Sequence, residues 1–292
     1  LMARNPAAQT AFGPMVQAAI EQYEPPERRL VDDDLALSLL PAGQRAVVHA
    51  MRWPLLRRLT IAAGERVAPG SWTLIACRKR FIDDKIEEAL ADVDAVVILG
   101  AGLDTRGLRL ARRSDIPVFE VDLPVNIARK SAAVQHSIGA LPAWVHLLPL
   151  DFEHDDLFAA LIGQGYRTDA RTFFVWEGVT QYLTEDAVRA TLTALQTAPA
   201  GSRLVFSYVR KDFIEGRNLY DAAVLYKRFR QRRQGWKFGL DPDDVAEFVG
   251  QYGWRLVEQT GPEYYRQHYI RPSGRRLAAS DLEWTAYAVR SR

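Results

Sequence analysis

Short, largely apolar runs that alternate with longer polar segments dominate the sequence from residue 93 onward. Each run has four or five residues, and the segments between the runs are long enough for crossover helices. Strands that are apolar on both faces and alternate with helices form parallel sheets that helices cover on either side. We therefore predict an α/β fold whose first five strands lie at residues 96–99, 118–121, 145–148, 173–176 and 204–208.

The sequence before residue 93 has the spacing of helices. Apolar residues recur there at intervals of three and four, as at Val47, Met51, Leu55 and Leu59, which is the period of one helix face. After the fifth strand, the pattern predicts a helix over 241–252, a strand over 254–259 and a last, half-exposed strand over 282–288. We expect a helical N-terminal cap over residues 1–92 and a seven-stranded α/β domain over residues 93–292.

Two segments, 210–240 and 261–280, do not fit the alternation and are rich in aromatic and basic residues. Ligands of open α/β sheets bind beyond the carboxyl ends of the strands. We therefore predict that both segments form a lid at the mouth of a site on that edge. The aromatic side chains that could stack on a ligand there are Tyr220, Tyr226, Trp236, Tyr264, Tyr265 and Tyr269.

Charge and cysteine content narrow the partners of the protein. Lys and Arg number 38 against 36 Asp and Glu, so a formal charge of +2 gives no overall attraction to nucleic acid. The longest stretch without a charged or strongly polar side chain, 95–103, is about half of a membrane span, and we expect no membrane partner. The single cysteine, Cys77, excludes an intrachain disulfide. Residues 1–20 do not match a secretory signal. For both reasons, we expect a cytoplasmic protein. The five histidines have no paired spacing, and we predict no metal site.

The first predicted strand runs into two glycines, Gly100 and Gly102, and then into a helix. Glycines permit the tight turn and let a ligand approach the backbone closely. Three residues after Gly102 stands Thr105 rather than glycine, so the dinucleotide fingerprint is incomplete. This departure counts against a nicotinamide cofactor.

The next three strands end in acidic residues at the same predicted edge. Asp122 lies 22 residues after Gly100, where a carboxylate binds the ribose hydroxyls of a nucleoside. Asp151 could accept a hydrogen bond from an adenine amino group beside the ring of Phe152, and Glu177 could face a cationic group. A simpler alternative is that Asp122 and Asp151 cap the following helices.

Together with the segments 77–84, 97–106, 119–130, 150–152 and 176–183, these residues resemble the leucine carboxyl methyltransferase-like family of S-adenosylmethionine-dependent O-methyltransferases, including its actinobacterial small-molecule branch. The resemblance covers about residues 75 to 185 and is carried by ordered motifs such as Trp176-Glu177-Gly178. It implies a class I methyltransferase (Rossmann-like) fold with a mostly parallel sheet, and S-adenosyl-L-methionine as cofactor.

Position by position, the resemblance assigns seven residues to the cofactor: Arg78, Gly100, Gly102, Asp122, Asp151, Phe152 and Glu177. Arg78 would pair with the methionine carboxylate, Asp122 would hold the ribose, and Glu177 would face the methionine end. The alternative for Arg78, and for Arg80 beside it, is an ion pair with Asp83 or Asp84 on the same helix.

The reaction that follows is methyl transfer to a carboxylate or hydroxyl oxygen of a small molecule, anionic or aromatic, such as a natural-product intermediate. A carboxylate acceptor needs no base at neutral pH, whereas a hydroxyl is helped by one. The candidates for this base at the predicted mouth are Tyr182, Tyr208 and His268, with Tyr269 beside them.

The alternative functions are those of an NAD(P)-dependent oxidoreductase and of a catalytically silent nucleotide-binding protein of the same fold. An RNA-binding role for the basic run 227–237 is less favoured, and homo-oligomers are left open.

Overall fold

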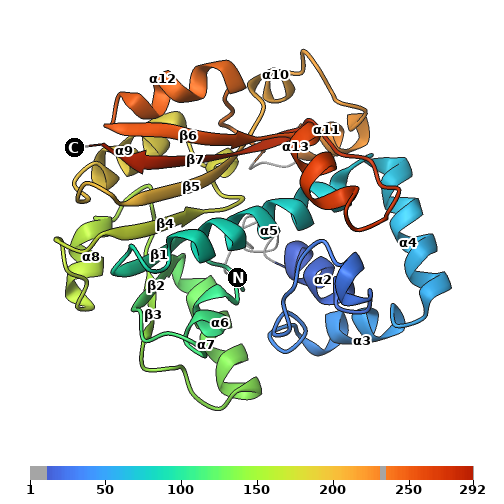
Figure 1. Ribbon diagram of the computed structural model, residues 1–292, viewed down its shortest axis with the longest axis horizontal. Helices are drawn as coiled ribbons and strands as arrows, with labels where there is room; N and C mark the ends of the chain where they lie inside the picture. The colour runs from blue at the N-terminus through green and yellow to red at the C-terminus, as the bar shows by residue number, and fades with distance from the viewer. Residues whose placement is uncertain (1–11, 231–234, 292) are drawn as a thin grey trace.

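The computed structural model describes residues 12–230 and 235–291 and contains one seven-stranded sheet (Figure 1). Its strand order is β3-β2-β1-β4-β5-β7-β6, in which β1 to β5 are parallel and β7 is antiparallel to both of its neighbours. The predicted mostly parallel, seven-stranded sheet is confirmed. Its strands are β1 (Ala95–Leu99), β2 (Val118–Asp122), β3 (Val145–Pro149), β4 (Thr172–Trp176), β5 (Arg203–Val209), β6 (Trp254–Thr260) and β7 (Glu283–Arg290).

Helices cover both faces of the sheet, because alternate strand residues point to opposite sides. On one face, Val97, Phe174 and Phe206 pack with residues of α8 (Leu157–Gly163), α9 (Glu185–Leu195) and α12 (Val245–Gly250), which follows the short turn η3 (Pro242–Asp244). On the other, Val96 and Phe173 pack with α5 (Ser71–Ala89) and α6 (Arg106–Leu110). Helix α7 (Pro124–Ser137) contacts β2 and β3.

From residue 12 on, the N-terminal region is helical, as predicted, while residues 1–11 of the predicted cap lie outside the described residues. It contains α2 (Phe12–Glu21), η1 (Pro26–Arg28), α3 (Ala42–Ala50) and α4 (Pro54–Val67), followed by α5. Met15 of α2 and Phe81 of α5 belong to the same buried cluster as the sheet residues Val96 and Phe173. The helices therefore share a core with the sheet, and the division at residue 92 stays a prediction.

The last strand corrects one expectation. The alternation around residues 282–288 predicted a half-exposed strand, but Glu283, Thr285 and Tyr287 are buried. The reason is that both faces of β7 are packed: Ala286 and Ala288 belong to the buried cluster on one face of the sheet, and Tyr287 belongs to the cluster on the other. Polar residues on this strand therefore find partners inside the protein.

The two predicted lid segments have different positions. Ala222, Leu225 and Trp236, near α10 (Lys211–Ile214) and α11 (Ala223–Arg230), line the main cavity. The segment 261–280, with α13 (Pro262–Tyr265) and the π-helical turn η4 (Arg266–Ile270), packs on α5 and α2 instead, so its predicted place over the mouth is wrong apart from Ser280.

A buried carboxylate explains where the segment 261–280 goes. Both oxygens of Glu21 accept hydrogen bonds from Arg275 at 2.7 Å, and Trp72 Nε1 donates to Glu21 Oε1 at 2.6 Å. The hydroxyl of Tyr269 donates to Asp84 at 2.9 Å. These contacts tie α2, α5 and the segment together on the side away from the cavity.

Candidate active site

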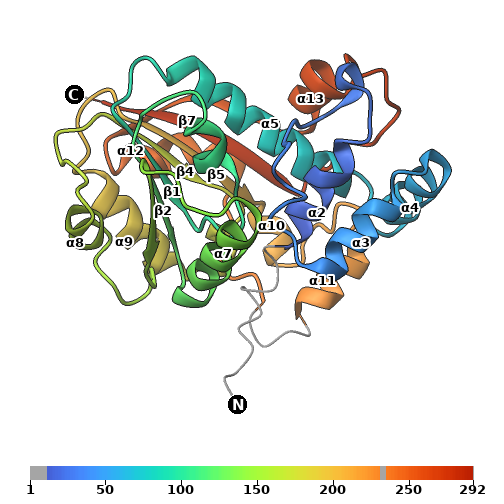
Figure 2. The same cartoon turned by 90° about the horizontal axis from the view of Figure 1, so that it is seen from below.

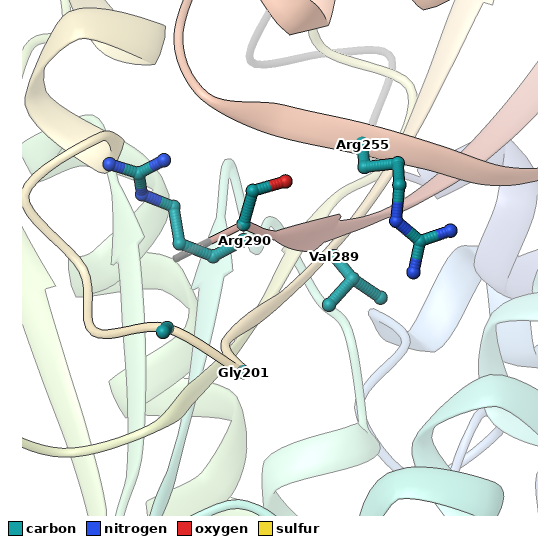
Figure 3. A pocket seen from close by; sticks show the side chains of 6 residues that line it. Gly201, Arg255, Val289 and Arg290 are labelled. Atoms are coloured by element: carbon teal, nitrogen blue, oxygen red, sulfur yellow. The ribbon is translucent and has the colours of Figure 1, made fainter.

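The main cavity lies at the carboxyl ends of β1 to β4 and has a volume of about 740 Å³. This size is within the range of small-molecule sites, about 300–1,000 Å³. A second hollow of about 510 Å³ lies near the amino end of β5 (Figure 3). Its two arginines, Arg255 and Arg290, point away from each other, and Arg290 already donates to two backbone carbonyls. The cavity at the carboxyl edge is therefore the candidate site.

The glycine turn forms one wall of this cavity. Gly100 and Gly102 have φ values of +73° and +50°, in the left-handed region that favours glycine. A Cβ atom at Gly100 would also collide with the side chain of Val179 from the β4 loop. Both the turn and the close approach of the two loops therefore require glycine at position 100.

Asp122 joins the glycine turn to the start of α7. Its carboxylate accepts hydrogen bonds from Gly102 N at 2.6 Å, Leu123 N at 2.6 Å and Asn126 Nδ2 at 2.8 Å. The residue is buried yet lines the cavity. Because an ionised carboxylate has about four acceptor positions, one remains for a ligand. No side chain caps α7, whose N-cap residue is Leu123, so the alternative of Asp122 as a helix cap is wrong.

A buried ion pair supports the turn from behind. Lys130 contacts both the carboxylate of Glu120 and the backbone oxygen of Asp104, and neither Lys130 nor Glu120 is exposed. Burial raises the pKa of Glu120, and Lys130 opposes this shift. Lys130 thus fixes the loop from behind and does not line the cavity.

Glu177 carries a fixed negative charge into the cavity wall. It pairs with Arg78 at 2.9 Å and Arg106 at 2.6 Å, while Lys79 lies 3.8 Å away. Burial alone would raise the pKa of Glu177, but Lys79, Arg106 and Arg78 outweigh it and hold the pKa at about 2. The carboxylate is therefore ionised at any physiological pH.

Arg78 is held by two carboxylates from distant strands. Besides Glu177 it pairs with Glu283 at the start of β7. Its predicted alternative, an ion pair on its own helix, is wrong for Arg78, whereas Arg80 does pair with Asp84 at 2.9 Å. Arg78 lines the cavity, and its contact with a methionine carboxylate stays a prediction.

Asp151 and Phe152 lie half-buried in the cavity wall after β3. Asp151 accepts a hydrogen bond from Glu153 N at 3.0 Å, while Asp156 caps α8 through Ala159 N. The alternative of Asp151 as a helix cap is therefore wrong. The turn leaves both side chains at the cavity, where an adenine contact stays a prediction.

Comparison with known proteins decides the family. The model for leucine carboxyl methyltransferase matches residues 11–196. The chain belongs to the leucine carboxyl methyltransferase family. The expected class of S-adenosyl-L-methionine-dependent methyltransferases, and S-adenosyl-L-methionine as cofactor, are thereby confirmed. Nothing in the site or in the relatives favours the oxidoreductase alternative.

The relatives of this methyltransferase include actinobacterial proteins. A protein of Mycobacterium avium (strain 104), assigned by name to the S-adenosyl-L-methionine-dependent methyltransferases, is 31% identical over 258 residues, which is 82% of this chain and 80% of that protein. A protein of the same name from Mycobacterium sp. (strain KMS) is 32% identical over 195 residues, and the match covers 62% of this chain and 61% of that protein.

Solved structures show the same fold. A Thermobifida fusca protein assigned to the methyltransferases superposes with a TM-score of 0.60 at 14% identity, over 100% of both chains. A DUF574 family protein from Streptomyces avermitilis gives 0.56 at 14% identity, over 94% of this chain and 96% of that one. The class I methyltransferase fold predicted from the motifs is confirmed.

The structure brings one of the three predicted base candidates to the cavity of the methyltransferase. Tyr182, in the turn η2 (Thr180–Tyr182), lines the cavity with its ring edge-on to Trp236, the centroids 6.5 Å apart. Tyr208 is wholly buried in the core between the sheet and its helices, where burial raises the pKa of its hydroxyl. His268 is exposed and stacks on Tyr264 with centroids 4.0 Å apart. The predicted mouth positions of Tyr208 and His268 are therefore wrong.

Several cavity residues of the methyltransferase were missed by sequence reasoning. Lys79 and Glu283 belong to the charged wall. Glu283 had a signal, since it is a charged residue at the start of a predicted strand, but its partner lies 205 positions away. Four other missed residues form an apolar wall without a motif: Leu74, Ile75, Leu225 and Leu282.

Among the described residues, no group of three or more His, Cys, Asp or Glu side chains is arranged to hold a metal ion. Nor does any helix in these ranges have the length and apolar character needed to cross a membrane.

Proposed function

We propose that this methyltransferase transfers the methyl group of S-adenosyl-L-methionine to an oxygen, carboxylate or hydroxyl, of a small molecule such as a natural-product intermediate. The observation that carries this proposal is the two-part lining of one cavity. Strand ends with carboxylates and glycines form one part. The other part, the apolar chamber, is formed by Leu74, Ile75, Leu225, Trp236 and Leu282.

The first part fits the cofactor. The free acceptor position of Asp122 suits a ribose hydroxyl, and the glycine turn gives the methionine portion a close path along the backbone. Asp151 and Phe152 would hold the adenine, while Arg78 and Glu177 would face the methionine end. The bound cofactor supplies an activated methyl group on a sulfonium.

Charge favours the cationic cofactor in this part. Six acidic residues line the cavity against three basic ones: Asp104, Asp122, Asp151, Glu153, Glu177 and Glu283 against Arg78, Lys79 and Lys237. The apolar chamber holds few of these charges, so its lining favours an aromatic or apolar acceptor body. The edge-on rings of Tyr182 and Trp236 are suited to pack against such a body.

The protein contributes alignment and exclusion of water rather than covalent chemistry. A carboxylate acceptor, with an ordinary pKa of about 4, needs no base. With a hydroxyl acceptor, Tyr182 is the candidate group at the cavity to receive or relay the proton. The cytoplasmic location and the oligomeric state stay predictions.

Calorimetric titration with S-adenosyl-L-methionine, S-adenosylhomocysteine and NADH tests the cofactor part. We expect binding of the two sulfur nucleosides alone. A panel of carboxylic acids and phenols, followed by mass spectrometry for a gain of one methyl group, tests the acceptor part. Cofactor binding without any methylated product would support the catalytically silent alternative, and methylation at nitrogen or carbon would contradict the oxygen acceptor.

A further inference from the structure

Helix α4 exposes several of its apolar side chains and buries an arginine, unlike an ordinary surface helix. Its buried residues are Arg57 and Ile61. Leu55, Leu56 and Leu59 are 71%, 41% and 58% exposed. Surface helices normally turn apolar residues inward and polar residues to water. An outward apolar face of this kind marks a place where another apolar surface docks.

The neighbouring residues extend this apolar surface. Trp53, directly before the helix, is 62% exposed, and Val67 at its end is 43% exposed. We call Trp53, Leu55, Leu56, Leu59 and Val67 the α4 face. Figure 1 and Figure 2 both show α4 at the outer end of the molecule, away from the sheet, where a large flat partner could reach it.

The charge around the α4 face is mainly positive. Residues 42–67 contain five arginines and one acidic residue, Glu65, which accepts a hydrogen bond from Gly70 N at 2.9 Å, although the whole chain is nearly neutral. Arg57 is buried and bound to Glu24 at 2.8 Å. The exposed Arg52 and Arg58 have no carboxylate of the described residues within 4 Å, and Arg52 lies over the Trp53 ring at 5.4 Å.

This charge argues against a second copy of the chain as the partner. A two-fold interface places the same patch of both subunits face to face. It would bring the unpaired arginines of one copy against those of the other, with Glu65 as the one acidic residue of 42–67 to set against five arginines. A surface with negative charge and an apolar interior satisfies both features of the α4 face.

We infer that the α4 face docks on an anionic lipid surface, with the leucines and Trp53 in the headgroup boundary and Arg52 and Arg58 on the lipid phosphates. Leucine and tryptophan flanked by basic residues are the composition of helices that lie in a membrane interface. The expectation of no membrane partner rested on the lack of a spanning segment, which this mode of binding does not need.

The α4 face adjoins the cavity along the chain. Ala68, Pro69 and Ser71, directly after α4, line the cavity. Docking would therefore hold one wall of the cavity close to the lipid. The inference stands on the α4 face alone and does not depend on which acceptor is methylated.

Co-sedimentation with vesicles tests this inference. We use the full chain with vesicles of equal parts phosphatidylcholine and phosphatidylglycerol, and with vesicles of phosphatidylcholine alone. We expect binding to the anionic vesicles that weakens as salt is raised. Leu55→Ser with Leu59→Ser should lower the partition constant by about tenfold or more, because two apolar side chains lose their burial. Arg52→Glu with Arg58→Glu should abolish the preference for anionic vesicles.

Two controls keep the test decisive. Ile162→Ser removes an apolar side chain that is 51% exposed on α8, far along the chain from α4, and should leave vesicle binding unchanged. Cofactor affinity measures folding, since none of the altered residues lines the cavity. Failure of the unaltered chain to bind anionic vesicles would overturn the inference. So would equal binding by the Leu55/Leu59 variant, or a dimer in sedimentation that this variant dissociates, which would assign the α4 face to a second copy.

Discussion

The two parts of the cavity are built in opposite ways. The cofactor part is made from strand ends, and its charged side chains are each fixed by two or more partners, as Asp122 and Glu177 are. The apolar chamber is made from helix α5, the residues around α11 and the start of β7, and its contacts are mainly between apolar or aromatic side chains. Charged side chains held in fixed positions suit a cofactor that is the same in every reaction cycle. Apolar side chains in the chamber wall can be replaced by others of different size, which would change the shape of the acceptor that fits.

The largest expected effect comes from removing the central cation of the cofactor part. Arg106 is 2% exposed and binds Asp83 at 2.5 Å, Glu177 at 2.6 Å and Asp104. Arg106→Met should destabilise the protein by about 3–5 kcal/mol, because it leaves buried carboxylates without their partner. Urea unfolding followed by circular dichroism measures this change.

The matched control for Arg106 is Arg112, whose ion pair with Asp34 is at the surface, with the arginine side chain 51% exposed. Arg112→Met should change the free energy of unfolding by less than about 1 kcal/mol. Equal effects of the two substitutions would mean that the buried cluster does not hold the cofactor part together.

Acid should weaken the cofactor part through Glu177. Burial opposes ionisation, but Lys79, Arg106 and Arg78 lower its pKa from an ordinary 4.5 to about 2. A carboxyl group whose pKa is lower in the folded state stabilises the fold above its unfolded-state pKa, and this contribution is lost as pH falls toward the folded-state pKa. We therefore expect the free energy of unfolding to decrease as pH falls from 4.5 toward 2. Glu177→Gln should flatten this decrease, whereas Glu185→Gln, at an exposed position of α9, should not.

Asp122 tests recognition of the cofactor directly. Asp122→Asn keeps the shape of the side chain but removes the charge and two of its acceptor positions. S-adenosyl-L-methionine affinity should fall by about tenfold to a hundredfold, as expected when a hydrogen bond to a charged group is lost. Calorimetric titration measures the dissociation constant. Asp156→Asn, which alters only the exposed cap of α8, should leave it unchanged.

The contrast between the two parts also explains what the sequence could predict. Strand ends can be located because apolar runs of four or five residues stop at a glycine or a carboxylate, and parallel strands bring these ends to one edge. This reasoning predicts Gly100, Asp122, Asp151 and Glu177 at the carboxyl edge of the sheet, and all four line the cavity. Their contacts with the cofactor stay predictions.

The wrong predictions for aromatic side chains have a common physical cause. The pattern of apolar and polar residues locates a strand or helix, but it does not say which of its faces meets the ligand. Ser207 accepts a hydrogen bond from Gly178 N at 2.8 Å beside the cavity, whereas the next residue, Tyr208, points into the core on the other face. Aromatic residues at Tyr264 and Tyr269 indicated a mouth, yet they pack on α5. The insertion of β7 between β5 and β6 is likewise invisible in chain order.

The apolar chamber should respond differently from the cofactor part. Trp236→Ala should raise the KM for the acceptor by about tenfold, because a large aromatic contact is lost. The dissociation constant of S-adenosyl-L-methionine should stay unchanged. Steady-state kinetics with the acceptor identified by the panel, together with calorimetry, separates the two. A loss of cofactor affinity equal to the rise in KM would show that the two parts act as one site.

The smallest effect is expected for Tyr208, where the hydroxyl is buried and has no hydrogen-bond partner among the described residues. A buried polar group without a partner destabilises the folded state. Tyr208→Phe should therefore leave the free energy of unfolding unchanged or raise it by up to about 1 kcal/mol, with kcat unaltered. Tyr182→Phe is the matched substitution at the cavity, and it should lower kcat only when the acceptor is a hydroxyl, since a carboxylate needs no base. A fall in kcat for Tyr208→Phe without a change in stability would place the proton acceptor in the core and contradict the assignment of Tyr182.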